Sequence, residues 1–343
     1  MPKMQSPSTG SPLWYRVGHM QGTPRLQHYV PQFLLKQFAR PDGKLWAYDT
    51  ENRKMFRASP RGLAAEGYFY GPTTEHATPQ ATAVETFLAD KVDGPGADAL
   101  SVLLAKRTLS STQAFAFFYF VAAQMLRTPA SLQRAADYST PILQETVARI
   151  AKLEPTFRKN AIANVKASGA TDSELAQFVQ ILDEGKFTVT PTREFTLVST
   201  LSAIEIAAQA LAEMRWTFLD LYPTDSDLLL GDHPVTMEDV GPASTSPMPL
   251  GIRNQNIEIA MPLSLRMVAL AHWDGPVDYG QLVPGTAGML NERTLRHVRR
   301  FAFTSYESGE LLERAIALRK TAPKFVMRQI RLGEKLIISP EFW

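Results

Sequence analysis

The stretch AAQALAEMRWTFLDLYPTDSDLLLGDHPV, residues 207–235, decides the fold class, because the spacing of its apolar residues changes within it. Up to Arg215 alanine and leucine recur at helical spacing, and with the preceding residues they predict a helix from Phe195 to Arg215. From Trp216 onward the apolar runs are short and are separated by turn residues, which is typical of β-strands. The sequence therefore predicts a helical part that gives way to a strand-rich part near Trp216.

The strand-rich part continues to the end of the chain. Its predicted strands are WTFLDLY, DLLLGDHPV, NIEIAMPLS and RMVALAHW. A predicted helix, Ala287 to Arg300, leads into the strand FAFTSY, and a last helix, Gly309 to Arg319, precedes the strand pair KFVMRQIRL and KLIISPEFW.

Before the helical part, RLQHYVPQFLLKQFARPDGKLWAYD (Arg25 to Asp49) predicts a helix followed by a strand. The helix is expected from near His28 to near Ala39, because Pro31 suits a first turn and Pro41-Asp42-Gly43 ends the pattern. KLWAYD and KMFRA, separated by TENR, predict a hairpin.

The helical part includes one long apolar helix, Thr112 to Leu126, which ends at Arg127-Thr128-Pro129. Thr171 and Glu174 have capping-box spacing.

This order predicts an α+β fold, with a mainly helical block flanked by an N-terminal β-hairpin and a C-terminal set of mostly antiparallel strands. The strands of both ends are expected to meet in one region. We expect a mobile leader at residues 1–24 and a single domain at 25–343. Within it lie the hairpin (44–58), the helical block (80–215) and the strand-rich part (216–343), and GPASTSPMP (Gly241 to Pro249) is expected to be an internal loop.

Composition excludes some classes of function. The 343 residues are 45% hydrophobic and 20% charged, as in ordinary globular proteins. A net charge of +2 gives little support for nucleic-acid binding by itself. The absence of cysteine excludes disulfides, thiolate metal sites and cysteine nucleophiles, and it fits a cytoplasmic protein. No P-loop, dinucleotide-binding, zinc-protease or Gly-x-Ser-x-Gly motif occurs.

No export or membrane segment is expected. The leader is rich in Ser, Pro and Gly and has no apolar core of the kind that signal peptides carry. The run AFAFFYFVAAQML, from Ala114 to Leu126, is too short to cross a bilayer and is followed by Arg127. We therefore predict a core helix there and a cytoplasmic location, with no membrane partner and an oligomeric state left open.

Several short motifs occur in a consistent order between about residues 26 and 305. They are HYVPQF with Leu35 and Phe38, then GKLWAYD (43–49), SP with AAE and FY (59–70), RTP (127–129), DHPV (232–235) and PLS (262–264). With these motifs the chain resembles the bacterial and fungal family called domain of unknown function 4238. Many members have two adjacent histidines where this chain has Gln27-His28, and an Asn where it has His233. The resemblance implies no reaction.

His28 is the first candidate for chemistry. An imidazole ionises near neutrality, so His28 could act as a general base or acid. A position at a helix N-terminus would lower its pKa and would attract anions. Equally, His28 could cap the helix and have a structural role.

Arg127 and Asp232 are the other two candidate catalytic residues. Arg127 could clamp a phosphate or carboxylate through its planar fork, or it could be a favourable cation at a helix C-terminus. Asp232 follows the apolar strand LLLG directly and could orient His28 or bind a metal. The alternative for Asp232 is an Asx turn ahead of Pro234.

Five further residues are candidate substrate-binding groups: Tyr29, Gln32, Lys36, Glu66 and His233. Glu66 is also a weaker candidate for a ligand or an acid, as is Glu85. The aromatic residues of the hairpin and the following loop could stack on bases, but we expect them to form the core face of the hairpin. The cofactor is unknown; a divalent metal is compatible with these residues, whereas no nucleotide cofactor is indicated.

These residues lead to two hypotheses. In the first, the chain is a hydrolase, similar to a phosphodiesterase or nuclease, which acts on a phosphate-bearing or nucleic-acid substrate. His28 would be the base, Arg127 the clamp and Asp232 the orienting residue. In the second, it is a non-catalytic interaction or binding protein in which the same residues are structural. We predict that His28, Arg127 and Asp232 converge on one concave pocket with Glu66 near its rim, because separate burial of such groups would be costly.

Overall fold

The computed structural model describes residues 25–71, 78–241, 251–275, 278–320, 325–332 and 335–342, with side chains up to residue 319. The chain divides into two compact units. The first contains the described residues up to 132 and from 197 to 320; the second contains residues 133–196 and the described residues from 325 onward. The predicted leader, and the predicted internal loop beyond Gly241, lie outside the described residues. A single domain over residues 25–343 stays a prediction.

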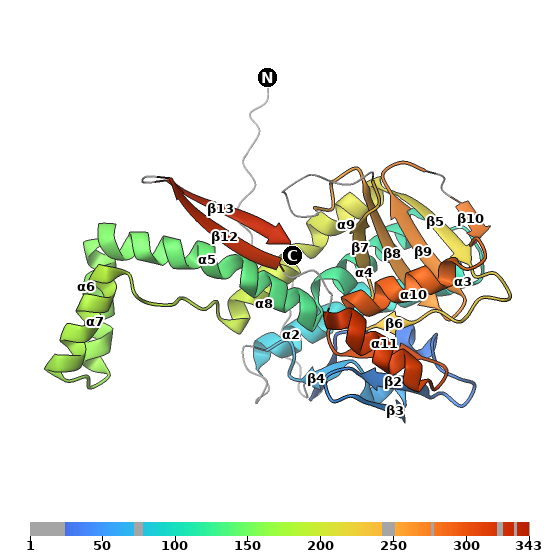
Figure 1. Cartoon of the computed structure of the whole chain (residues 1–343), viewed down its shortest axis with the longest axis horizontal. Helices are drawn as coiled ribbons and strands as arrows, with labels where there is room; N and C mark the ends of the chain where they lie inside the picture. Colours follow the sequence, from blue (N-terminus) through green and yellow to red (C-terminus); the bar gives the residue numbers. More distant parts are fainter. Residues whose placement is uncertain are drawn as a thin grey trace, which may run out of the picture. The chain divides into compact units, whose positions relative to one another are not determined.

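A four-stranded sheet in the first unit joins the two ends of the sequence (Figure 1). β2 (Leu45–Asp49) and β3 (Lys54–Ala58) form the predicted hairpin. β2 also pairs antiparallel with β11 (Phe301–Thr304), whose other side pairs with β6 (Leu230–Gly231). The N-terminal hairpin and the C-terminal strands therefore meet in one sheet, as the sequence predicted.

A five-stranded sheet forms the centre of the same unit. Its order is β10 (Asp278–Gln281), β5 (Arg215–Asp220), β9 (Met267–His272), β8 (Ile257–Ser264) and β7 (Thr236–Asp239). Its pairings are antiparallel except that of β10 with β5. Both sheets are thus dominated by antiparallel pairs beside many helices, so the predicted α+β class is confirmed.

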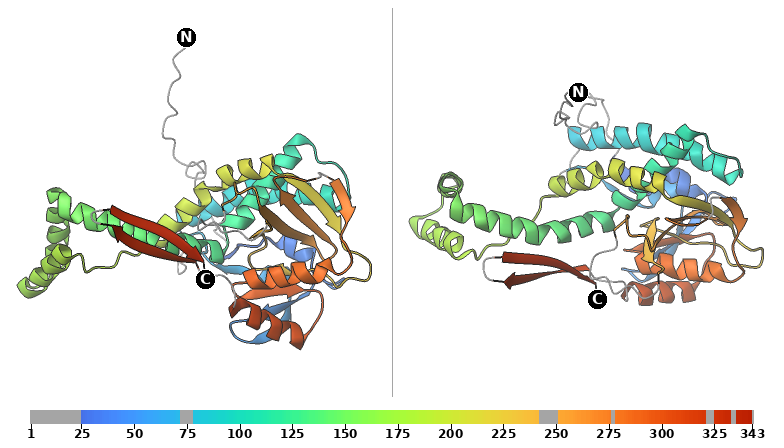
Figure 2. Two further views of the ribbon diagram at one scale, coloured as in Figure 1. Left: turned by 45° about the horizontal axis from the view of Figure 1, so that its top comes forward. Right: turned by 90° about the horizontal axis from the view of Figure 1, so that it is seen from above.

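Helices cover both faces of the five-stranded sheet (Figure 2). On one face, Phe117 packs with its ring centroid 5.2 Å from that of Trp216 and 5.8 Å from that of Phe218. On the opposite face, the Arg293 side chain of α10 forms an ion pair with the Glu258 side chain of β8. The helices concerned are α3 (Gly94–Leu104), α4 (Ser111–Leu126) and α9 (Ile204–Glu213) on the first face, and α10 (Thr286–His297) on the second. α11 (Gly309–Lys320) packs on the hairpin of β2 and β3.

The predicted apolar helix before Arg127 is confirmed as α4, which begins with a capping box at Ser110 and Gln113. The prediction of a single helix from Phe195 to Arg215 was wrong. This stretch is divided into α8 (Arg193–Ser202) and α9 at Ala203. The helical pattern runs through both pieces, so side-chain spacing alone could not show the break.

The prediction of a helix starting near His28 was also wrong. β1 (Leu26–His28) pairs antiparallel with β4 (Ala65–Gly67), and α1 (Gln32–Lys36) begins only after Pro31. Pro31 is extended, with φ −69° and ψ 148°, and residues before a proline also favour extended backbone. His28 therefore lies in a strand and does not cap a helix.

A π-helical segment, η3 (Leu88–Asp93), lies between α2 (Pro79–Phe87) and α3. Hydrogen bonds of the π type are rare, and single π turns occur often at functional sites. Nothing in the apolar spacing of these residues predicted it. It places Asp93 at the junction with α3, directly before Gly94 and Pro95.

The second unit consists mainly of α5 (Pro129–Leu153), which begins in the first unit, and the helix pair α6 (Pro155–Ala167) and α7 (Asp172–Glu184). α6 and α7 lie side by side (Figure 2). The capping box predicted at Thr171 is confirmed at the start of α7. β12 (Phe325–Leu332) and β13 (Lys335–Phe342) form the predicted terminal strand pair.

One helical stretch among the described residues is long and apolar enough to cross a membrane by length and composition. It is Arg193–Glu213, whose most apolar window is 44% buried. Core helices of water-soluble proteins pass the same test, so this stretch carries no further conclusion.

Candidate active site around Arg127

Arg127 lies at the C-terminal cap of α4 and is completely buried. Its fork binds the Asp93 carboxylate with two hydrogen bonds, Nη1 to Oδ2 at 3.1 Å and Nη2 to Oδ1 at 2.7 Å. Gln124, one turn earlier on α4, accepts from Arg127 Nε at 2.8 Å when its amide oxygen faces the guanidinium. A buried guanidinium needs such partners, because an unpaired one would cost several kcal/mol.

His28 approaches this ion pair from β1. Its Nε2 lies 3.1 Å from the carbonyl oxygen of Arg61, which can only accept, so the neutral ring carries its proton on Nε2 and a lone pair on Nδ1. Burial lowers the pKa of His28, and the Arg127 charge lowers it further. The carbonyls of Arg61 and Pro60 and the charge of Asp93 act in the other direction. A neutral imidazole is the form that can accept a proton.

Glu85, on α2, faces the same ion pair. Burial raises the pKa of Glu85 to about 7, against the lowering effect of Arg127, and Asp93 raises it further. Among the described residues, none donates a hydrogen bond to Glu85. Its carboxyl group therefore keeps a proton up to neutral pH and can act as an acid.

Tyr70 and Gln27 hold these elements together. The Tyr70 hydroxyl donates to the carbonyl of His28 at 2.9 Å and is hydrogen-bonded with Arg127. The buried Gln27 side chain accepts from Tyr70 N–H at 2.8 Å and donates to the carbonyl of Ala81 on α2 at 3.4 Å. The β1 strand is thereby fixed against the start of α2.

We call the following residues the Arg127 cluster: His28, Tyr70, Glu85, Asp93, Gln124 and Arg127. Arg127, Tyr70 and Gln124 are buried, whereas His28, Glu85 and Asp93 are partly exposed; 23% of the Asp93 side chain is accessible. Solvent therefore reaches the titratable groups while the cation stays inside.

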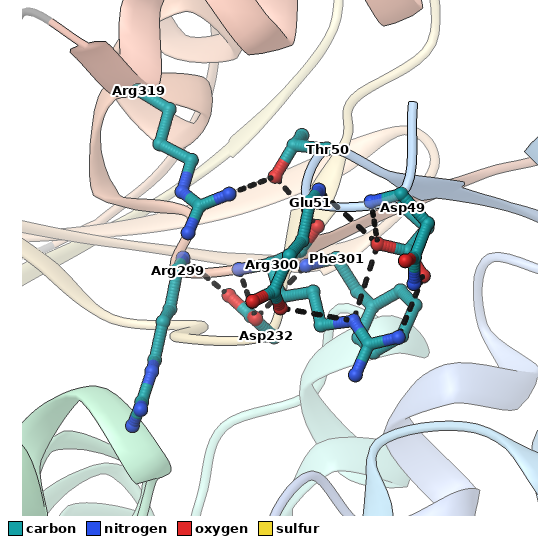
Figure 3. A network of polar contacts seen from close by, with 9 residues as sticks. Asp49, Thr50, Glu51, Asp232, Arg299, Arg300, Phe301 and Arg319 are labelled. Atoms are coloured by element: carbon teal, nitrogen blue, oxygen red, sulfur yellow. Dashed lines mark hydrogen bonds and ion pairs between the residues drawn. The ribbon is translucent and has the colours of Figure 1, made fainter. Parts of the chain in front are cut away.

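Asp232 has a different environment (Figure 3). Its carboxylate accepts three backbone N–H groups: Arg299 at 2.9 Å, Arg300 at 2.7 Å and Phe301 at 2.9 Å. Burial raises the pKa of Asp232, and the three N–H groups counteract that rise. Asp232 thus fixes the backbone that leads into β11. It makes no Asx turn ahead of Pro234, because these donors come from residues far along the chain.

Asp49, the last residue of the GKLWAYD motif, binds the side chain of Arg300 with Nε to Oδ1 at 3.1 Å and Nη2 to Oδ2 at 2.8 Å. Asn52 also donates to it. Burial alone would raise the pKa of Asp49, but the donors Arg300 and Asn52 hold it well below its usual value. We call Asp49, Asp232, Arg299, Arg300 and Phe301 the Asp232 network (Figure 3).

His28 and Arg127 therefore belong to one cluster, and Asp232 makes its hydrogen bonds in the other. A contact between the next residues in the sequence links the cluster to the network. Thr128, which follows Arg127, has its Oγ1 2.8 Å from Nδ1 of His233, which follows Asp232. Burial raises the pKa of Tyr29, which follows His28, and the Asp232 charge raises it further. A single concave pocket shared by His28, Arg127 and Asp232 stays a prediction.

The predicted substrate-binding residues lie in varied environments. His233 is buried with Thr128, and Tyr29 is buried with its ring against Phe69. Glu66 is exposed on β4 opposite Gln27, Lys36 is exposed, and Gln32 is half-buried.

Sequence reasoning did not select Asp93 or Gln124, and it considered Tyr70 only among the aromatic residues that could stack on bases or form the core face of the hairpin. Asp93 could not have been found from local spacing, since its importance depends on the π-helical segment. In the part of the chain with described side chains, no group of three or more His, Asp or Glu residues could hold a metal ion.

The chain has no match among curated proteins or among solved structures. The model of one sequence family, described as "Protein of unknown function (DUF4238)", matches residues 26–306, a range that includes the whole Arg127 cluster. That range is most of the chain, and this protein belongs to the DUF4238 family.

Proposed function

We propose that this protein is a hydrolase that uses the Arg127 cluster for general acid–base catalysis. The observation that supports the proposal best is the pair of titratable groups beside Arg127. The pKa of His28 lies below the usual 6.5, and that of Glu85 lies at about 7. Between these two values an unprotonated base and a protonated acid are present together, which acid–base catalysis requires.

The charge of the cluster favours one kind of phosphate substrate. Arg127 is already neutralised by Asp93, so an anion can bind the guanidinium only by displacing that carboxylate. Because the Asp93 side chain is partly exposed, its carboxylate can be hydrated by solvent when the ion pair breaks. A phosphodiester carries one negative charge, as Asp93 does, whereas a phosphomonoester dianion would add a charge next to Glu85. We therefore expect a phosphodiester, including that of a nucleic acid.

In the proposed reaction, Nδ1 of His28 accepts a proton from water as the water oxygen bonds to phosphorus. Glu85 donates its proton to the leaving oxygen as the phosphorus–oxygen bond breaks. The products are a phosphomonoester and an alcohol, and a proton passes from His28 back to Glu85 through solvent. Arg127 stabilises the charge that develops on the phosphoryl oxygens.

The test is hydrolysis of bis-p-nitrophenyl phosphate and of a single-stranded oligonucleotide, with p-nitrophenyl phosphate as the monoester. We expect Glu85→Gln and His28→Asn each to lower kcat/KM about a hundredfold. Glu307→Gln, at an exposed carboxylate outside the cluster, should leave it unchanged. The rate should show a bell-shaped pH profile whose alkaline limb lies near 7 and disappears in Glu85→Gln. Equal activity of the wild type and of the three variants would refute the proposal.

A second candidate function, a non-catalytic binding protein, is favoured by the saturation of Arg127 and Asp232. Each has its hydrogen-bonding groups occupied by protein partners, as in a structural tie. Under this alternative, Glu85→Gln and His28→Asn would lower the melting temperature at pH 4 as well as at pH 8, and the wild-type protein would hydrolyse none of the three substrates. A melting curve recorded beside the activity assay separates the two functions.

A further inference from the structure

The helices of the second unit bury very little of their own surface. Of residues 133–196, only Ala151, Leu182 and Thr196 are buried. A folded unit of about 60 residues normally buries about 60% of its surface, which is needed to offset the loss of conformational entropy. The large apolar side chains that remain exposed in residues 133–196 are Tyr138, Ile142, Leu153, Phe157, Ile181 and Phe195.

Two of them, Ile142 and Leu153, belong to one stripe on α5, which we call the α5 stripe. Ile142 and Leu153, 37% and 69% exposed, are separated by eleven residues, or about three helical turns, and so lie on one face. Glu145 and Arg149 lie between them on that same face and form an ion pair one turn apart. The stripe therefore has apolar ends and two opposite charges at its centre.

The charge of this region argues against two kinds of partner. Residues 133–196 contain eight Lys or Arg and eight Asp or Glu, so their net charge is zero. Nucleic acid and anionic membranes are bound through an excess of cations, which this region lacks.

We infer that the α5 stripe binds a second copy of this chain, antiparallel and related by a two-fold axis near position 147. That axis places Ile142 opposite Leu153 of the second copy and Glu145 opposite Arg149 of the second copy. Both pairings fit one register, because the midpoints of the two pairs, 147.5 and 147, differ by only half a residue, or about 0.75 Å along the helix. A two-fold contact has to be complementary to itself, and this stripe is. The inference is independent of the proposed function.

The first experiment measures the mass of the full chain by light scattering and sedimentation over a range of concentrations. We expect the wild-type chain to be a dimer. Ile142→Asp and Leu153→Asp should each raise the dissociation constant of the dimer a hundredfold or more. Ile206→Asp is the matched control, since Ile206 is 70% exposed on α9 in the first unit. It should dimerise normally. A wild-type chain that stays monomeric at all concentrations would overturn the inference.

Charge reversal tests the register. Glu145→Arg alone places two arginines opposite each other, and Arg149→Glu alone places two glutamates opposite each other, so each variant should be about tenfold weaker as a dimer. A mixture of the two variants should form a heterodimer with near wild-type affinity, because both facing pairs are then opposite in charge.

The ion pair within one helix cannot explain such a rescue, since neither chain of the mixture regains it. Failure of the mixture to form a heterodimer would rule out this antiparallel register. Flotation of a monomeric chain with phosphatidylcholine vesicles would instead identify a lipid surface as the partner, and would also overturn the inference.

Discussion

The Arg127 cluster and the Asp232 network both contain partly or fully buried carboxyl groups of the first unit. The two differ in the hydrogen-bond donors that reach Glu85 and Asp232. Burial raises the pKa of Asp232, but its carboxylate accepts three backbone N–H groups that counteract the rise. Glu85 receives no hydrogen bond from any residue in the described part of the chain, and its pKa rises to about 7. Donors from the backbone stabilise a carboxylate and fix its position, whereas a half-buried carboxyl without donors retains its proton.

This difference bears on the structural role of Asp232 and on the chemical role that we propose for Glu85. A charged residue at the end of a strand or helix suggests a site, as Asp232 did in the sequence. Its hydrogen-bond partners decide whether it is free to react. Three mutations test the comparison, from the largest expected effect to the smallest.

Asp232→Ala should lower the free energy of unfolding by about 4 kcal/mol, because it removes the buried carboxylate that accepts three backbone N–H groups. Denaturant unfolding measures this change. Asp98→Ala, at an exposed position on α3, is the control and should be nearly neutral. A loss below about 1 kcal/mol for Asp232→Ala would mean that Asp232 is not the tie that we describe.

Glu85→Gln should raise the free energy of unfolding at alkaline pH, whereas Asp232→Ala lowers it. The folded-state pKa of about 7 lies above the ordinary value of 4.5, so ionisation of Glu85 opposes folding as the pH rises from 4.5 through 7. At pH 8 the Gln variant should be more stable than wild type by about 3 kcal/mol, and at pH 4 the two should be alike. Melting temperatures at the two pH values provide the measurement. A variant destabilised at both would place Glu85 among the structural residues.

Asp49→Asn should have the smallest effect, and that effect should disappear in acid. The pKa of Asp49 is lowered in the folded state, so its contribution to stability is present above pH 3.8 and is lost as the pH falls below that value. Because Arg300 is partly exposed, we expect a difference of about 1 kcal/mol at neutral pH. The difference should shrink towards zero in unfolding curves recorded below about pH 3. A constant difference at every pH would show that the charge of Asp49 contributes nothing.

Much of the fold could be predicted because it depends on neighbours in the sequence. The hairpin of β2 and β3, the apolar helix α4 and the capping box at Thr171 each follow from residues a few positions apart. Part of the candidate site could be found in the same way. His28 and Arg127 were selected from their residue types and from their positions beside predicted elements.

The amino-acid sequence by itself determined the α+β class, the order of hairpin, helices and strands, and the motifs that carry the family resemblance. Only the tertiary structure decided that His28 lies in a strand paired with β4, that η3 brings Asp93 to Arg127, and that Asp232 binds the backbone at Arg299. Periodicity records which side of an element is apolar, and it extends over a few residues. Partners for buried charges come from segments far along the chain, so the roles of these charges are decided when those segments pack together.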